Sequence, residues 1–205
     1  FFNLSYGLYI ITTKAEGHFA GCIVNTVVQA TAEEKPKLLV TVNKENDTNI
    51  TMKKAKKVNI SVLSQEADML LIGKFGFRTS KEFNKLEGTD VISGENGIPV
   101  VTQNVVSYIE AKIIDEIDCC THTVFVLEAE EAKQLSDKPA MTYDYYHKVI
   151  KGNAPKNAPT YQGDIEPQKE KPVIGDTASR YVCSVCGYVY DGDINKEPDD
   201  FHCPV

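Results

Sequence analysis

The sequence lacks the features that mark membrane-spanning and exported proteins. Although 42% of its 205 residues are hydrophobic, no apolar run approaches the roughly 18 residues that a membrane helix needs. No basic segment followed by a cleavable apolar core stands at its start, so secretion is not expected. No patch rich in lysine and arginine suggests a nucleic-acid partner. We therefore expect a protein that binds neither membrane nor nucleic acid.

A positive balance of charge is also missing. The net charge is −7, and residues 161–205 hold nine acidic but only four basic side chains. An acidic tail suits a basic protein partner, because electrostatic attraction raises the rate of encounter. A solvated acidic surface without a partner accounts for the same composition, and both interpretations stay open at this point.

The evenly scattered cysteines of a small secreted fold are absent as well. The six cysteines are clustered or solitary instead: Cys183 and Cys186 in a CxxC, Cys203 before a proline, Cys119 beside Cys120, and Cys22 alone. In a chain without an export signal, clustered cysteines indicate metal ligands or redox groups, and they favour a cytoplasmic location. Cys22 and at least one of the adjacent pair are expected to pack as small core thiols.

Regular alternation of strands and helices is missing too, which argues against a doubly wound α/β fold. Helices are predicted only at Asp47–Lys57, with Ile50 and Met52 facing inward, and at residues 65–73. Near-continuous apolar strands suit a closed barrel, so we expect a mainly β protein with a few helices. The predicted strands are Tyr6–Thr13, Phe19–Thr31, Lys37–Asn43, Val58–Ser64, Val105–Ile117 and His122–Ala129.

The composition divides the chain into three expected parts. Residues 1–150 form the β domain. Residues 151–178 carry prolines at positions 155, 159, 167 and 172 and are expected to be a semi-extended linker. Residues 179–205 are too few to fold on a core of their own and need a staple such as a bound metal.

The most specific pattern in the chain is Tyr-Val-Cys183-Ser-Val-Cys186-Gly-Tyr-Val-Tyr-Asp, followed by Cys203-Pro. A CxxC loop can turn both sulfurs toward one ion, and the aromatic β-forming run after it predicts a hairpin. Residues 180–205 resemble a rubredoxin, in the trimmed form that is fused to larger proteins. The resemblance implies iron bound by Cys183, Cys186 and Cys203, with a fourth cysteine expected directly after Val205. A structural zinc ribbon is the alternative, because tetrahedral thiolate sites also bind zinc.

Polar residues interrupt the β domain at two places. Asn25 and Gln29 fall on one face of a predicted strand and Thr26 on the other, where unpaired polar groups would be costly. Farther on, a strand end, Lys44 and the start of a predicted helix near Thr48 lie within five residues. Helix-start amides together with a lysine charge make an anion site.

In order, these motifs resemble the flavin reductase-like family, whose fold is an FMN-binding split β-barrel. The resemblance covers roughly residues 1–150 and rests on Gly7–Thr13, Asn25-Thr26-x-x-Gln29, Asn43-Lys44-x-Asn46-x-Thr48, Phe75–Ser80, Thr121–Phe125 and Tyr143–Tyr146. It implies that Asn25, Thr26, Gln29 and Thr31 contact the flavin ring edge or ribityl chain. It also implies that Lys44, Asn46 and Thr48 hold the phosphate, that Phe77 and Arg78 approach FMN on a loop, and that His122 lies near the face where nicotinamide stacks.

Plainer interpretations of these residues remain open. Lys44 and Thr48 could be a solvated lysine and part of a helix cap, and His122 could be a strand histidine with a backbone partner. Hydride transfer needs no acid–base side chain, so no catalytic residue is predicted.

The fusion itself predicts a route for electrons. Nicotinamide gives two electrons as hydride, a rubredoxin iron takes one, and FMN can convert between the two. Proteins with this fusion, high-molecular-weight rubredoxins, imply an NAD(P)H-dependent homodimer that passes electrons to a flavodiiron protein. The alternatives are a free-flavin or ferric reductase with an incidental rubredoxin unit, and a non-enzymatic zinc-ribbon binding module. No adenine-site signature chooses between NADH and NADPH.

Overall fold

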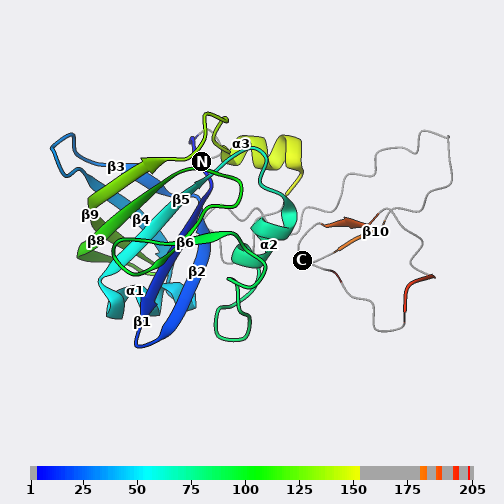
Figure 1. Cartoon of the computed structure of the whole chain (residues 1–205), viewed down its shortest axis with the longest axis horizontal. Helices are drawn as coiled ribbons and strands as arrows, with labels where there is room; N and C mark the ends of the chain where they lie inside the picture. The colour runs from blue at the N-terminus through cyan, green and yellow to red at the C-terminus, as the bar shows by residue number, and fades with distance from the viewer. Residues whose placement is uncertain (1–3, 153–180, 184–187, 191–195, 199–202, 204–205) are drawn as a thin grey trace.

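The computed structural model of the chain describes residues 4–152, 181–183, 188–190, 196–198 and 203. Its main body is a seven-stranded antiparallel sheet with strand order β2-β1-β5-β8-β9-β4-β3, which curls around a core (Figure 1). The strands of this sheet are β1 (Tyr9–Ala15), β2 (His18–Val24), β3 (Val27–Gln29), β4 (Lys37–Asn43), β5 (Lys57–Leu63), β8 (Val105–Cys119) and β9 (His122–Gln134). The expected mainly β architecture is therefore confirmed.

The two edge strands of this sheet are consecutive in sequence. β2 forms one edge and β3 the other, and only Asn25 and Thr26 separate them. β2 also contacts β4, the neighbour of β3. The chain thus crosses directly from one edge of the curled sheet to the other, and the barrel is split where β2 and β3 part.

Helices and a short hairpin cover the openings of the curled sheet. α1 (Asp47–Ala55) lies against β1 and β2, and α2 (Met69–Gly76) packs on β2. The hairpin of β6 (Val91–Ser93) and β7 (Pro99–Val101) contacts β1 and β5. A short helix α3 (Tyr143–Tyr145) continues into a π-helical turn, η1 (Tyr146–Ile150).

Two groups of buried apolar side chains form the core. One fills the barrel and includes Ile11, Val40, Met52, Ile60 and Phe125. The other lies between α2, the start of β1 and the turn η1, with Leu8, Leu71, Phe75 and Tyr146. Gly152 packs so closely on the Tyr146 ring that a Cβ there would lie 2.0 Å from a ring carbon.

Several details differ from the sequence-based expectations. The predicted strand Phe19–Thr31 is two strands, because the chain turns at Asn25 and Thr26 to change edges. Ile50, expected to face inward, is 43% exposed, whereas Met52 is fully buried. Two helical residues that are two positions apart point about 200° apart, so they cannot share the buried face. The second helix begins at Met69 rather than near residue 65, because Asp68 caps it through the amide of Leu71.

The described residues near the C-terminus include one small hairpin. β10 (Tyr181–Val182) pairs antiparallel with β11 (Val189–Tyr190), and the Cys183 amide donates to the Tyr188 carbonyl at 2.8 Å. A hairpin was predicted at this place. The predicted linker from 153 onward and Cys186 lie outside the described residues. Among the described residues, no helix is long and apolar enough to cross a membrane.

Candidate functional site

The start of α1 is a buried polar corner. Asn46, with extended backbone angles, caps the helix by accepting a hydrogen bond from the Thr48 amide at 3.1 Å. The Thr48 side chain is 0% exposed, and its Oγ1 has no partner with hydrogen-bond geometry in the described part of the chain. An unpaired buried hydroxyl costs free energy, so a polar ligand at this corner would satisfy it.

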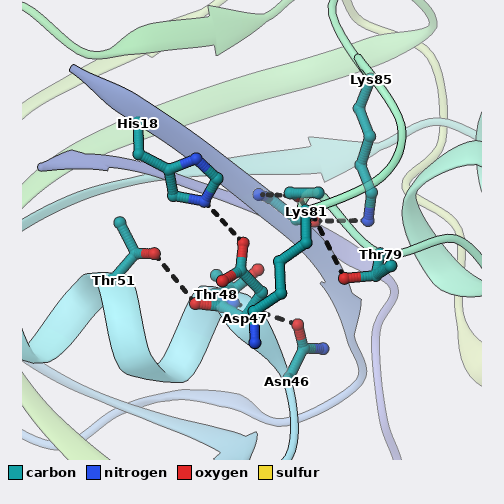
Figure 2. Close-up of polar contacts among 10 residues, drawn as sticks. His18, Asn46, Asp47, Thr48, Thr51, Thr79, Lys81 and Lys85 are labelled. Carbon is teal, nitrogen blue, oxygen red and sulfur yellow. Dashed lines mark hydrogen bonds and ion pairs between the residues drawn. The ribbon is translucent and has the colours of Figure 1, made fainter.

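Asp47, the first helical residue, is buried beside Thr48. Its Oδ2 lies 2.7 Å from Nε2 of His18, which is at the beginning of β2 (Figure 2). The Asp47 backbone carbonyl also accepts a hydrogen bond from the Thr51 hydroxyl at 2.9 Å. A carboxylate favours a helix N-terminus but repels another anion there, so the charge of Asp47 must be offset before this corner can bind a phosphate.

A buried lysine supplies part of that compensation. Lys85 is 1% exposed, and its Nζ donates to the carbonyls of Gly21 at 2.7 Å and Phe75 at 3.2 Å. Burial lowers the pKa of Lys85 to about 8, against the raising effects of the nearby Cys22 thiol and Asp47 carboxylate. The ammonium is therefore mostly protonated at neutral pH. We refer to Cys22, Asp47, Thr48 and Lys85 together as the α1 cluster.

Cys22 belongs to this cluster as a buried thiol on β2. Burial raises its pKa, and the neighbouring Thr48 hydroxyl, Lys85 ammonium and Asn46 side chain offset this only in part. It packs with the barrel core, as expected for a small hydrophobic residue.

The junction between β2 and β3 carries four of the predicted flavin contacts. Asn25 is buried, and its Oδ1 accepts a hydrogen bond from the Thr26 hydroxyl at 3.0 Å. Gln29 and Thr31 are exposed farther along the chain, where the Gln29 side chain donates to the Thr31 carbonyl at 2.8 Å. The Thr31 hydroxyl accepts from the Lys37 amide and donates to Glu33. The four residues thus form two pairs, of which only the first is partly buried.

Lys44 and His122 are brought together by the pairing of β4 with β9. Asn43 lies opposite His122 in the register, and the Lys44 amide donates to the Thr121 carbonyl at 3.0 Å. The Lys44 ammonium is 2.6 Å from Asp118, and this hydrogen bond holds the pKa of Asp118 below its ordinary value. Partial burial lowers the pKa of His122, which favours the neutral imidazole.

Cys119 and Cys120 form part of the same β8–β9 turn. Both are exposed, which contradicts the expectation that at least one packs in the core. Cys120 has a φ of 56°, and its amide donates to Asp118 at 2.9 Å, so the pair ends a hairpin instead of crossing a buried strand.

Phe77 and Arg78 follow α2, on the side of the barrel where α2 meets β2. Phe77 is the C-cap residue of the helix, and the Arg78 guanidinium lies 5.6 Å from the Phe83 ring centroid. The loop continues through Thr79 and Ser80, and the Lys81 side chain extends toward the start of α1 (Figure 2). This loop and the α1 cluster therefore face the same stretch of β2.

Sequence reasoning missed three residues at this corner: His18, Asp47 as a buried carboxylate, and Lys85. The helix cap was predicted at Asp47 and Thr48, whereas the structure gives that position to Asn46 and makes Asp47 the first helical residue. Lys85 carries no local signal, since it reaches Gly21 from 64 positions away in sequence.

The predicted metal ligands are only partly covered by the structure. Cys183 and Cys203 are half-buried, whereas Cys186 lies outside the described residues. Among the residues that are described, no group of three or more histidine, cysteine or acidic side chains could hold a metal ion.

The α1 corner fits a phosphorylated cofactor such as FMN. It offers a helix N-terminus, the Lys81 side chain (Figure 2), and the Thr48 hydroxyl, which has no hydrogen-bond partner among the described residues. Lys44 lies three residues before the first residue of this helix. The Asp47 carboxylate lies within hydrogen-bond distance of His18, and the positive charge of Lys85 acts on it.

Comparison with known proteins identifies the family of this chain. Residues 1–154 match the flavin reductase like domain, so the chain belongs to that family. It is 46% identical over 162 residues to a ferric-chelate reductase (NAD(P)H) of Archaeoglobus fulgidus, covering 78% of this chain and 95% of that protein. It is also 35% identical over 216 residues to a high molecular weight rubredoxin of Moorella thermoacetica, covering 99% of this chain and 92% of that one.

A solved structure supports the fold. The flavin reductase HpaC, determined in complex with NADP+, matches with a TM-score of 0.59 and 24% identity, over 68% of this chain and 86% of that one. At this identity the likeness concerns the fold alone.

Proposed function

We propose that this protein is an NAD(P)H-dependent flavoprotein oxidoreductase in which residues 1–150 bind FMN and residues 179–205 bind a rubredoxin-type iron. The observation that carries the proposal is the buried Thr48 hydroxyl at the N-terminus of α1, which has no hydrogen-bond partner within the described residues of a flavin reductase-like domain. When bound, FMN accepts two electrons as hydride from nicotinamide and releases them singly, which a one-electron iron acceptor requires.

In this proposal the side chains bind and orient the cofactor and transfer no proton in the hydride step. Lys44, Asn46 and Thr48 hold the phosphate end. Asn25, Thr26, Gln29 and Thr31 line the ribityl chain or ring edge, and Phe77 and Arg78 approach from the loop after α2. His122 lies beside the nicotinamide position, where its lowered pKa keeps it neutral and avoids adding a charge next to the hydride path.

The C-terminal unit is the proposed exit for electrons. Cys183, Cys186 and Cys203 would ligate the iron, and a tether made by residues 151–178 would let the unit reach an acceptor. The name of the relative that matches 99% of the chain, a high molecular weight rubredoxin, supports this assignment. We propose a flavodiiron-type protein as the acceptor, and a cytoplasmic homodimer as the working form.

An absorption spectrum with metal analysis, followed by anaerobic titration with NADH and NADPH, tests the proposal. We expect a flavin band and an iron–thiolate charge-transfer band, with the flavin bleaching first. A colourless purified protein that takes up no added FMN would exclude it. Deleting residues 179–205 should abolish transfer to a flavodiiron partner and leave NAD(P)H oxidation by the flavin domain intact.

Reduction of ferric chelates is a second candidate. It is favoured by the 46% identity with the ferric-chelate reductase, which spans 78% of this chain. In this case the ferric ion is a substrate, and the chain lacking residues 179–205 should reduce a ferric chelate as fast as the full chain does. A large loss of that rate on deletion would favour the relay instead.

A further inference from the structure

Ser80 and Lys85, which follow α2, are attached to the open edge of the barrel at Gly21. Gly21 lies in β2, opposite Thr12 of β1, and β2 has no strand on its other side in the described sheet. The Gly21 amide donates to the Ser80 hydroxyl at 3.1 Å, and the Gly21 carbonyl accepts from Lys85 at 2.7 Å. Two side chains of the loop therefore satisfy backbone groups that an edge strand would otherwise leave to solvent.

The contact at Gly21 is close as well as polar. A Cβ at this position would lie 3.0 Å from a Phe75 ring carbon and 3.1 Å from the Ile11 carbonyl oxygen. Phe75 is fully buried in the last turn of α2. The absence of a side chain at Gly21 thus lets the end of α2 approach β2, which brings Lys85 within reach of the strand.

Lys85 joins three elements through one ammonium group. It donates to β2 at Gly21 and to the Phe75 carbonyl near the C-terminus of α2, where a cation also favours the helix dipole. Its Nζ lies 5.7 Å from the Phe75 ring centroid, and its charge acts on Asp47 at the start of α1. These contacts offset the large cost of burying a charge.

We propose that Lys85 is a positioning residue of the cofactor site, which fastens the loop of residues 77–84 to β2 and so sets where Phe77 and Arg78 stand relative to the start of α1. The loop is held at both ends: α2 precedes Phe77, and Lys85 closes the loop against the same strand that carries Cys22. The effect on the cofactor rests on the proposed FMN function, whereas the fastening of the loop does not.

The test compares Lys85→Met with the wild-type full-length chain, because methionine keeps the length of the side chain and removes its charge and donors. We expect trypsin to cleave after Arg78 at least about tenfold faster in Lys85→Met, as the loop opens. We also expect the FMN dissociation constant to rise about tenfold, because Phe77 and Arg78 are then no longer held in place before the cofactor binds. Ser80→Ala, which removes the neighbouring contact only, should give a smaller change in the same direction.

Lys54→Met is the matched control, since Lys54 is an exposed lysine at the other end of α1 that pairs with Glu16. It should leave both measurements within about twofold of wild type. Cleavage and FMN affinity of Lys85→Met that also stay within twofold would overturn the proposal. If Lys85→Met does not fold, an unchanged Ser80→Ala variant would overturn it, because Lys85 would then be a core residue only. If the wild-type chain binds no FMN, the proposed function fails, and cleavage after Arg78 still decides whether Lys85 holds the loop.

Discussion

The barrel contains two buried polar clusters that differ in one respect. The β5–β8 cluster consists of Asn59, Asn96 and Glu110, and its polar groups are paired. Glu110 accepts hydrogen bonds from the amides of Glu95 at 3.0 Å and Asn96 at 2.9 Å. The Asn59 side chain donates to the Ile98 carbonyl at 2.9 Å and accepts from the Asn96 side chain.

The α1 cluster is buried throughout, whereas Asn96 of the β5–β8 cluster is half-buried, but the α1 cluster is incompletely paired. Thr48 Oγ1 lacks a hydrogen-bond partner among the described residues, and the Lys85 ammonium acts on Asp47 and Cys22 through charge. A buried polar group that the protein satisfies itself holds the fold, whereas one that it leaves open suits a ligand. The contrast predicts that substitutions in the β5–β8 cluster lower stability and leave FMN binding unchanged. A substitution of Thr48 should instead weaken FMN binding and leave stability unchanged.

The largest expected effect is on the stability of a Glu110→Ala variant. Removing the carboxylate leaves the amides of Glu95 and Asn96 without acceptors, at a cost of about 1.5 kcal/mol each, because both hydrogen bonds are only partly buried. We expect the free energy of unfolding, measured in urea, to fall by about 3 kcal/mol. The FMN dissociation constant of the folded variant should stay within twofold of wild type. If fully folded Glu110→Ala shows a tenfold change in FMN affinity, the proposed difference between the two clusters is wrong.

The next effect is a pH dependence of the free energy of unfolding that is caused by Lys85. Its folded-state pKa of about 8 lies below the ordinary value of 10.5, so the unfolded chain binds more protons between these values. The contribution of Lys85 to stability therefore rises with pH through this window. Relative to Lys85→Met, the wild-type free energy of unfolding should increase by about 1 kcal/mol from pH 7 to pH 9.

The substitution also acts on a neighbour, because the Lys85 ammonium lowers the pKa of the Cys22 thiol and its loss raises that pKa further. The raised pKa of Cys22 works in the opposite direction, because a thiol that stays protonated in the fold loses stabilisation as the pH rises. The Asp47 carboxylate is the other charge that acts on Lys85. If the free energy of unfolding changes equally with pH in wild type and Lys85→Met, the Lys85 ammonium is not desolvated as its burial implies.

A smaller effect on stability is expected for Thr48→Val, which replaces the open hydroxyl by a methyl group of the same shape. Because the hydroxyl has no hydrogen-bond partner in the described structure, the free energy of unfolding should stay within about 0.5 kcal/mol of wild type or rise. The FMN dissociation constant should increase about tenfold, measured by quenching of flavin fluorescence. If Thr48→Val is destabilised and its FMN affinity is unchanged, Thr48 has a structural role like that of the β5–β8 cluster.

The sequence predicted the local parts of this architecture better than the long-range ones. Strand β4 was predicted with its observed bounds, Lys37–Asn43, because it is a continuous β-forming run between turn residues. β6 and β7 have three residues each and were missed, because so short a segment carries no periodic signal. The break at Asn25 and Thr26 follows from closing the barrel, which no local preference encodes.

The candidate site shows the same division. The helix start was predicted within one residue of the observed cap Asn46, because a capping pattern is local. The roles of Lys44, Asn46 and Thr48 in holding a phosphate stay predictions. Lys85 was not found, since its role depends on Gly21 and Phe75 coming together in the fold. Ile50 was misplaced because an apolar residue two positions from Met52 was assigned to the same helical face.

The smallest expected effect concerns Asp118, which pairs with Lys44 and would compete for it with the phosphate that we propose Lys44 binds. Its carboxylate lies 2.6 Å from the Lys44 ammonium and is 75% exposed, so salt screens the pair. Replacing it in Asp118→Asn frees Lys44 for the cofactor phosphate and should tighten FMN binding about twofold at low ionic strength, less at high salt. Lys44→Met should weaken binding with the same salt dependence. If Asp118→Asn weakens FMN binding, the ion pair of Lys44 with Asp118 orients the site. Lys44 then has a structural role, like the paired groups of the β5–β8 cluster, and not the ligand-binding role proposed for Thr48.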